Sequence, residues 1–132
     1  MSIAAPPEPN TVGLSPAGKV AVQRLIDGKI FLRQIDVYRF AIALGLAHGG
    51  YEGGIPKGDT MFNIGTLDPD GSLRTAVELL RGERDEPVLR SAERYAEWGV
   101  REMDRAYAGG SIRFSSWLAE AAESARERPE QG

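Results

Sequence analysis

The glycine-rich segment from His48 to Gly58 is the first part of the sequence whose residue types could do chemistry. It reads HGGYEGGIPKG and contains Lys57, and glycine loops that carry a lysine can bind phosphate through backbone N–H groups. A P-loop needs Gly-Lys-Ser/Thr at the start of a helix, and this spacing is missing, as is the GxGxxG pattern of dinucleotide-binding folds. We therefore interpret the segment as a loop that ends a helix.

Two groups of carboxylates resemble fragments of known sites. The segment 68–71, DPDG, matches the start of a calcium-binding loop, but Leu79 occupies the position of the closing glutamate. Asp85 and Glu86 are adjacent, yet the pattern around them predicts exposure, whereas acid–base catalysts are tuned by burial. We interpret the first group as a turn and the second as solvated surface.

His48 is the only histidine of the chain, and there is no cysteine. A zinc cluster needs several such ligands, and no serine or cysteine has a plausible companion base for nucleophilic catalysis. At the end of a helix, the His48 side chain is expected near exposed carbonyl groups. The sequence thus predicts no catalytic residue, no metal site and no cofactor, in a protein that is not an enzyme.

Basic side chains are in excess only in the first half of the chain. Residues 11–50 carry five basic and two acidic side chains, whereas residues 51–132 carry 11 basic and 16 acidic ones, and the whole chain has a net charge of -3. A basic surface would meet DNA phosphates without reading the base sequence. The candidate phosphate-binding residues are Lys19, Arg24, Lys29, Arg33 and Arg39. Because solvated surfaces often show such asymmetry, both interpretations stay open.

Two tryptophans, Trp98 and Trp117, are candidate partner-binding residues. Trp98 lies off the apolar stripe of its predicted helix, beside Gly99, and a large aromatic side chain in such a position is typical of a contact surface. It could equally cover the edge of the core beneath a C-terminal helix. Phe114 and Trp117 leave the same two interpretations open.

The central helix that must organise these residues is predicted at 34–47, QIDVYRFAIALGLA. It is apolar on nearly all sides, so it belongs either in the centre of the fold or in a subunit interface. Gly45 costs helix propensity and would let another backbone approach closely. Before it, Ser15 and Pro16 predict the start of a helix that ends near Asp27. Residues 29–33 form a short connector that could be extended.

The second half of the chain predicts one extended segment and further helices. The alternating residues 61–67, MFNIGTL, favour an extended conformation, and Ser72 is expected to cap a helix over 73–82. The longest helix is expected to begin at Asp85 and Pro87 and to end at Gly109-Gly110. Its Arg/Glu face is predicted to be exposed to solvent. A last helix is expected after Ser115 or Ser116.

These elements predict a mainly α protein with a single domain. A chain of 132 residues with 42% hydrophobic residues can fill one core, here a bundle of four to five helices around a buried central helix. We expect a flexible tail at 1–12, a helical domain at 13–125 and a frayed tail at 126–132. No leader or membrane span is visible, and the absence of cysteine fits a cytoplasmic protein. The apolar surface of 34–47 predicts a homo-oligomer.

Three segments resemble small accessory proteins encoded beside bacterial DNA phosphorothioation (Dnd) and related DNA-modification defence clusters. They are VYRFAIALGLAHGG at 37–50, IPKGDTMFNIGTL at 55–67 and ERYAEWGVREM at 93–103. In that group, a buried helix ends in glycine, a loop leads to an extended apolar segment, and a helix similar to Glu-x-Tyr-Ala-x-x-Gly follows. The resemblance covers roughly residues 29–104.

The chain is also similar in outline to the E-type subunit of the Dnd systems. That subunit has a Phe-Asn-x-x-Thr-Leu segment, matched here by Phe62, Asn63, Thr66 and Leu67. The resemblance implies a helical oligomer with affinity for DNA. It leads us to expect a non-enzymatic accessory protein of a bacterial DNA-modification or antiphage defence system, which binds DNA, other proteins of the system, or both. The alternative is a protein–protein interaction or regulatory module without DNA contact.

Overall fold

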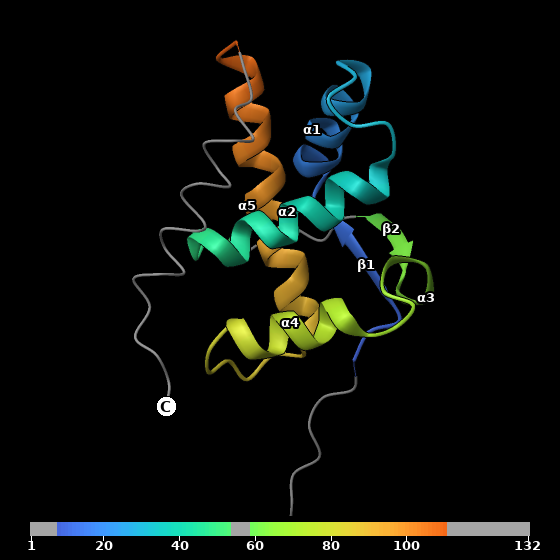
Figure 1. Cartoon of the computed structure of the whole chain (residues 1–132), viewed down its shortest axis with the longest axis vertical. Helices are drawn as coiled ribbons and strands as arrows, with labels where there is room; N and C mark the ends of the chain where they lie inside the picture. Colours follow the sequence, from blue (N-terminus) through green and yellow to red (C-terminus); the bar gives the residue numbers. More distant parts are fainter. Residues whose placement is uncertain (1–7, 54–58, 111–132) are drawn as a thin grey trace, which may run out of the picture.

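The computed structural model describes residues 8–53 and 59–110, and it confirms the predicted fold class. The described part is mainly helical, with one small two-stranded antiparallel sheet (Figure 1). In chain order the elements are β1 (Thr11–Leu14), α1 (Pro16–Asp27), α2 (Gln34–His48), β2 (Asp59–Asn63), α3 (Ile64–Leu67), α4 (Ser72–Leu80) and α5 (Val88–Ala108).

Helices α2 and α5 cross near their middles and together form the centre of the domain (Figure 1). The prediction that helix 34–47 is buried is confirmed, but α5 is the element that contacts α1, α2, α4 and β1. The apolar side chains of α2 are largely covered by the chain itself, and Leu44 and Leu46 are only 5% and 8% exposed. A subunit interface is therefore not needed to bury this helix.

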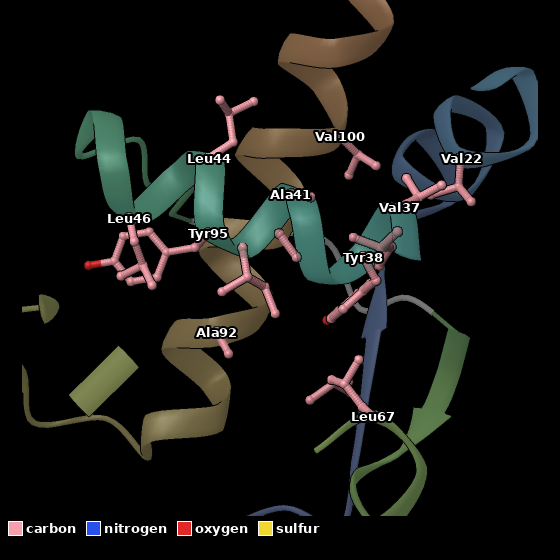
Figure 2. Close-up of a cluster of buried hydrophobic side chains, with 14 of the residues drawn as sticks. Val22, Val37, Tyr38, Ala41, Leu44, Leu46, Leu67, Ala92, Tyr95 and Val100 are labelled. Atoms are coloured by element: carbon pink, nitrogen blue, oxygen red, sulfur yellow. The ribbon is translucent and has the colours of Figure 1, made fainter. Parts of the chain in front are cut away.

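Two glycines allow α2 and α5 to approach closely. A Cβ atom on Gly45 would lie 2.7 Å from the carbonyl oxygen of Tyr95, and one on Gly99 would lie 2.2 Å from that of Ala41. The predicted role of Gly45 is thus confirmed, and Gly99 has the same role on the other helix. Figure 2 shows the side chains packed around this crossing, with Ala41 of α2 above Ala92 and Tyr95 of α5.

The predicted ends of the first two helices are confirmed. Helix α1 begins at Pro16, and the Ser15 hydroxyl accepts a hydrogen bond from the Gly18 amide, as an N-cap should. Helix α2 ends at His48, and its C-cap is Gly49, whose φ of 66° lies in the left-handed region that glycine adopts without strain. The connector at 29–33 contains no strand.

Strand β1 was not predicted from the sequence. It pairs with β2, with Val12 opposite Phe62, and its buried side chains Val12 and Leu14 join the core. The expected tail at 1–12 therefore differs from the structure at residues 8–12, because Glu8 contacts α5 and the strand begins before residue 13. Four residues give too short an alternation to reveal a strand whose partner lies far along the chain.

The remaining differences concern element ends. The extended segment predicted at 61–67 is a strand only to Asn63, after which the chain turns into the short helix α3. Helix α4 ends at Leu80 rather than residue 82, and its cap is the Asp68 carboxylate rather than Ser72. The helix expected after Ser115 or Ser116 lies outside the described residues. No helix in the described part of the chain combines the length and apolar character that a membrane crossing requires.

Candidate functional site

Three of the five candidate phosphate-binding residues lie in ion pairs with carboxylates of the same chain. The pairs are Lys19–Asp59 at 3.1 Å, Arg24–Asp104 at 2.5 Å and Arg33–Asp36 at 2.9 Å. The hydrogen bond from Arg33 lowers the pKa of the Asp36 carboxyl. Two of the three acidic partners come from distant segments, so the excess of positive charge counted along residues 11–50 is largely neutralised in three dimensions.

The other two candidates, Lys29 and Arg39, occupy different surroundings. The Arg39 guanidinium donates hydrogen bonds to the carbonyl oxygen of Leu67 at 2.8 and 3.1 Å, so it anchors the end of α3 to α2. Lys29 is exposed in the loop between α1 and α2, where its φ of 59° is left-handed. The five residues therefore do not form one continuous set of unpaired cations.

Trp98 covers the end of α2 as a half-buried side chain on α5. Its ring stacks on that of His48 with 6.1 Å between centroids, and it fills the space beside Gly50, where a Cβ atom would lie 2.0 Å from the indole. This contact covers part of the Trp98 ring, and the side chain as a whole is half-buried. The second candidate, Trp117, lies outside the described residues, as do Phe114 and Lys57.

Glu97 is the one wholly buried charged residue that the sequence pattern placed on a solvated face. Its carboxylate accepts hydrogen bonds from the Ser15 amide at 2.9 Å, from the Ser15 hydroxyl at 2.7 Å and from Arg101 Nε at 2.7 Å. Gly18 makes room for it, because a Cβ there would lie 2.9 Å from both carboxylate oxygens. The Arg101 side chain is 36% exposed and links this buried charge to solvent and to Glu52.

The network around Glu97 is a structural anchor rather than a reactive centre. Its two hydrogen bonds from Ser15 attach the start of α1 to the middle of α5, and Glu93, one turn earlier, accepts from the Gly13 amide in the same way. The Glu97 carboxylate accepts three hydrogen bonds within the chain and is wholly buried, so a substrate has no access to it. The prediction of a solvated face is wrong here because Ser15 and Gly18, its partners, are about 80 residues away in the chain.

A second polar cluster joins the end of α2 to the start of α5. The Tyr51 hydroxyl donates to the Glu86 carboxylate, which also receives a hydrogen bond from the Ser91 hydroxyl at 3.0 Å and lies 3.3 Å from Arg94 Nε. The Arg84 guanidinium lies over the Tyr51 ring, 3.6 Å from its centroid. Glu86 is thus half-buried and bound, contrary to the expectation of a solvated carboxylate pair.

The Tyr51 phenol is held in its neutral form by this cluster. Burial and the hydrogen bond to Glu86 raise the pKa of Tyr51 to about 12, because an ionised phenolate would lose solvation and would lie against a carboxylate. Tyr51 therefore acts as a hydrogen-bond donor, whereas a base or nucleophile would need a lowered pKa.

A pocket with a volume of about 390 Å³ lies between the C-terminal ends of α1 and α5. It is lined by Arg24, Asp27, Gly28, Asp104, Tyr107 and Ala108. Volumes of about 300–1,000 Å³ are typical of sites for small organic groups. No local pattern in the sequence marks this pocket, because its two walls come together only through the packing of α1 on α5.

These clusters and the pocket lie within residues 8–53 and 59–110. Within those ranges, no group of three or more His, Asp or Glu side chains is placed to hold a metal ion. The chain matches no model of a known protein family, no curated protein and no solved structure. The structure defines a small, mainly helical domain, and its candidate sites are the Glu97 and Glu86 clusters and the pocket between α1 and α5.

Proposed function

We propose that this chain is a non-enzymatic accessory protein that acts by binding a partner protein, in a bacterial DNA-modification or antiphage defence system. The first part rests on the described surface, and the placement in a defence system rests on the resemblance of the segments at 37–50, 55–67 and 93–103. The engagement of the Glu97 and Glu86 carboxylates in hydrogen bonds within the chain supports a binding role over a catalytic one.

The observation that favours protein over DNA as the partner is the pairing of the basic residues. Lys19, Arg24 and Arg33 each lie beside a carboxylate, so together with these partners they contribute no net charge to the surface. Attraction to DNA depends on a net positive surface that releases counterions from phosphates. The chain as a whole carries a net charge of -3, which would oppose that attraction.

An electrophoretic shift assay separates the two kinds of partner. We expect no shift of plain, nicked or phosphorothioated duplexes at any salt concentration, down to low ionic strength, where phosphate contacts are strongest. The Lys29→Ala/Arg33→Ala double variant is the matched control, because it removes the two exposed basic residues of one loop. A shift that this variant abolishes would replace the proposal with DNA binding.

The partner itself is sought among the products of neighbouring genes. Each neighbour is co-expressed with the chain and tested for a complex of fixed stoichiometry, and we expect one with a modification or restriction component. Housekeeping genes on both sides, with no such complex, would contradict the placement in a defence system. The result of the electrophoretic shift assay does not depend on which genes lie beside this one.

A further inference from the structure

The pocket between the ends of α1 and α5 has a consistent electrostatic character. Both helices run in the same direction, because Ser15 at the start of α1 contacts the middle of α5 and Arg24 contacts Asp104 near its end (Figure 1). Their C-terminal ends therefore meet at the pocket. Each helix end carries a partial negative charge of about half a unit, which arises from the aligned dipoles of its peptide groups.

The side chains of the pocket add to this negative potential. Asp27 and Asp104 contribute two charges, and Arg24 offsets one of them. Asp104 is 19% exposed, whereas Arg24 is 61% exposed, so the carboxylate is the more deeply buried of the two charges. Asp27 accepts from the Gln23 amide at 2.8 Å, and a neutral partner of this kind leaves its charge in place.

An aromatic side chain supplies the apolar part of the site. The Tyr107 ring lies against the C-terminal cap of α1, and this is possible only because residue 28 is glycine. A Cβ atom on Gly28 would lie 2.2 Å from the Tyr107 hydroxyl oxygen. An aromatic ring beside carboxylates is a favourable environment for an alkylammonium or guanidinium group, which gains cation–π and ion-pair interactions together.

We propose that this pocket binds an organic cation, namely a lysine or arginine side chain of a partner polypeptide. The identity of the source rests on the proposed protein-binding function, whereas the preference for a cation rests only on the pocket. Two carboxylates, one of them paired with an arginine, are too few ligands for a bare metal ion, and the volume of about 390 Å³ leaves room for an organic group. The site would contribute charge complementarity and orientation to a larger interface.

The test is a titration followed by nuclear magnetic resonance of ¹⁵N-labelled chain, with Nα-acetyl-lysine methyl ester as the probe. We expect saturable shifts of the Gly28 and Ala108 amide signals. The decisive variant is Arg24→Gln, which removes the competing cation and should strengthen binding about two- to fivefold. Asp27→Asn should weaken binding by a similar factor. Lys19→Gln, a change of equal charge at the other end of α1, should leave it unchanged.

The shape of the site is tested without altering its charge. Gly28→Ala should displace Tyr107 and abolish the shifts, while circular dichroism reports whether the fold is intact. An absence of saturable shifts with the wild-type chain, or weaker binding after Arg24→Gln, would overturn the proposal.

Two further probes check the class and source of the ligand. Phosphate should not shift the same signals, and a phosphate effect that Arg24→Gln removes would show an anion site instead. Spermidine binding without acetyl-lysine binding would overturn the assignment to a protein side chain. Because every probe is a small molecule, these outcomes are independent of whether a partner protein is found.

Discussion

At the scale of a single residue, Glu97 joins the start of α1 to the middle of α5. Its carboxylate has no contact with solvent and holds the N-cap residue of α1 by two hydrogen bonds. A buried charge is tolerated only when its oxygens are bonded, and here Arg101 supplies the opposite charge. The free energy of folding therefore depends on this residue more than its place in an Arg/Glu-rich helix suggests.

The substitution Glu97→Ala should lower the free energy of unfolding by about 3–5 kcal/mol, because it leaves the Ser15 donors without an acceptor and Arg101 without its partner. Urea denaturation measures this change. The control is Glu102→Ala, which breaks an exposed ion pair with Arg105 and should cost less than about 1 kcal/mol. Equal losses for the two variants would show that the buried network does not carry this stability.

Tyr51 makes stability depend on pH in the alkaline range. Its pKa is about 12 in the folded chain against an ordinary value of 10. The unfolded chain therefore loses this proton at lower pH than the folded chain, so the stabilisation is complete below pH 10 and is lost as pH rises towards 12. Tyr51→Phe should flatten the decline of the unfolding free energy over this range.

The measurement is urea denaturation at several pH values between 9 and 12, with Tyr107→Phe as the matched control. Tyr38 also has a raised pKa, caused mainly by burial, so part of the decline should remain in the Tyr51 variant. If Tyr51→Phe leaves the whole decline in place, the Glu86 cluster does not hold the phenol neutral.

At the scale of elements, the crossing of α2 and α5 depends on Gly99. Gly99→Ala should destabilise the fold by about 1–3 kcal/mol, because the added methyl group would meet the Ala41 backbone and push the two helices apart. This is the net loss, which remains after alanine has gained about 1 kcal/mol in helix propensity over glycine. Thermal or urea unfolding measures it.

The control for this crossing is Gly65→Ala in α3, where the nearest atom to an added Cβ is the Asn63 side-chain oxygen at 4.0 Å. We expect a change within about 0.5 kcal/mol there. A neutral Gly99→Ala variant would mean that the helices can separate without cost.

Helix α5 receives its N-terminal cap from outside its own sequence neighbourhood. The Glu8 carboxylate accepts hydrogen bonds from the Val88 and Leu89 amides at 2.9 and 2.8 Å. Glu8→Ala should cost about 0.5–2 kcal/mol and should speed hydrogen exchange of these two amides. Asp85→Ala, the residue that the sequence pattern places at the helix start, should leave their exchange rates unchanged. Faster exchange of these amides in Asp85→Ala but not in Glu8→Ala would show that Asp85 is the cap.

At the scale of the whole molecule, the burial of α2 changes the expectation of self-association. Its apolar side chains are covered within one chain. The large apolar side chains that are exposed in the described part lie on three separate segments: Val20 on α1, Leu32 between α1 and α2, and Leu79 and Leu80 on α4. Stable homodimers usually bury a large, continuous apolar surface. We therefore predict a monomer, as measured by light scattering across a range of concentrations; a stable dimer would support the original expectation.

Local patterns in the sequence determined which segments are helical and where several of them end. Ser15 with Pro16, and Gly49 after an apolar run, act within one or two helical turns, so their meaning can be read without the fold. The burial of residues 34–47 follows for the same reason, since an apolar helix must be covered by something.

Only the tertiary structure decided how the charged residues of this protein are used. Glu8, Glu97 and Asp104 each meet a partner about 80 residues away, and a hydrophobic pattern treats all three simply as polar positions. Long-range contacts also pair two of the candidate DNA-binding cations, Lys19 and Arg24, with carboxylates and bring two helix ends together at a pocket. The sequence specifies these contacts only through the packing of the whole chain, because electrostatic partners are set by distance in space.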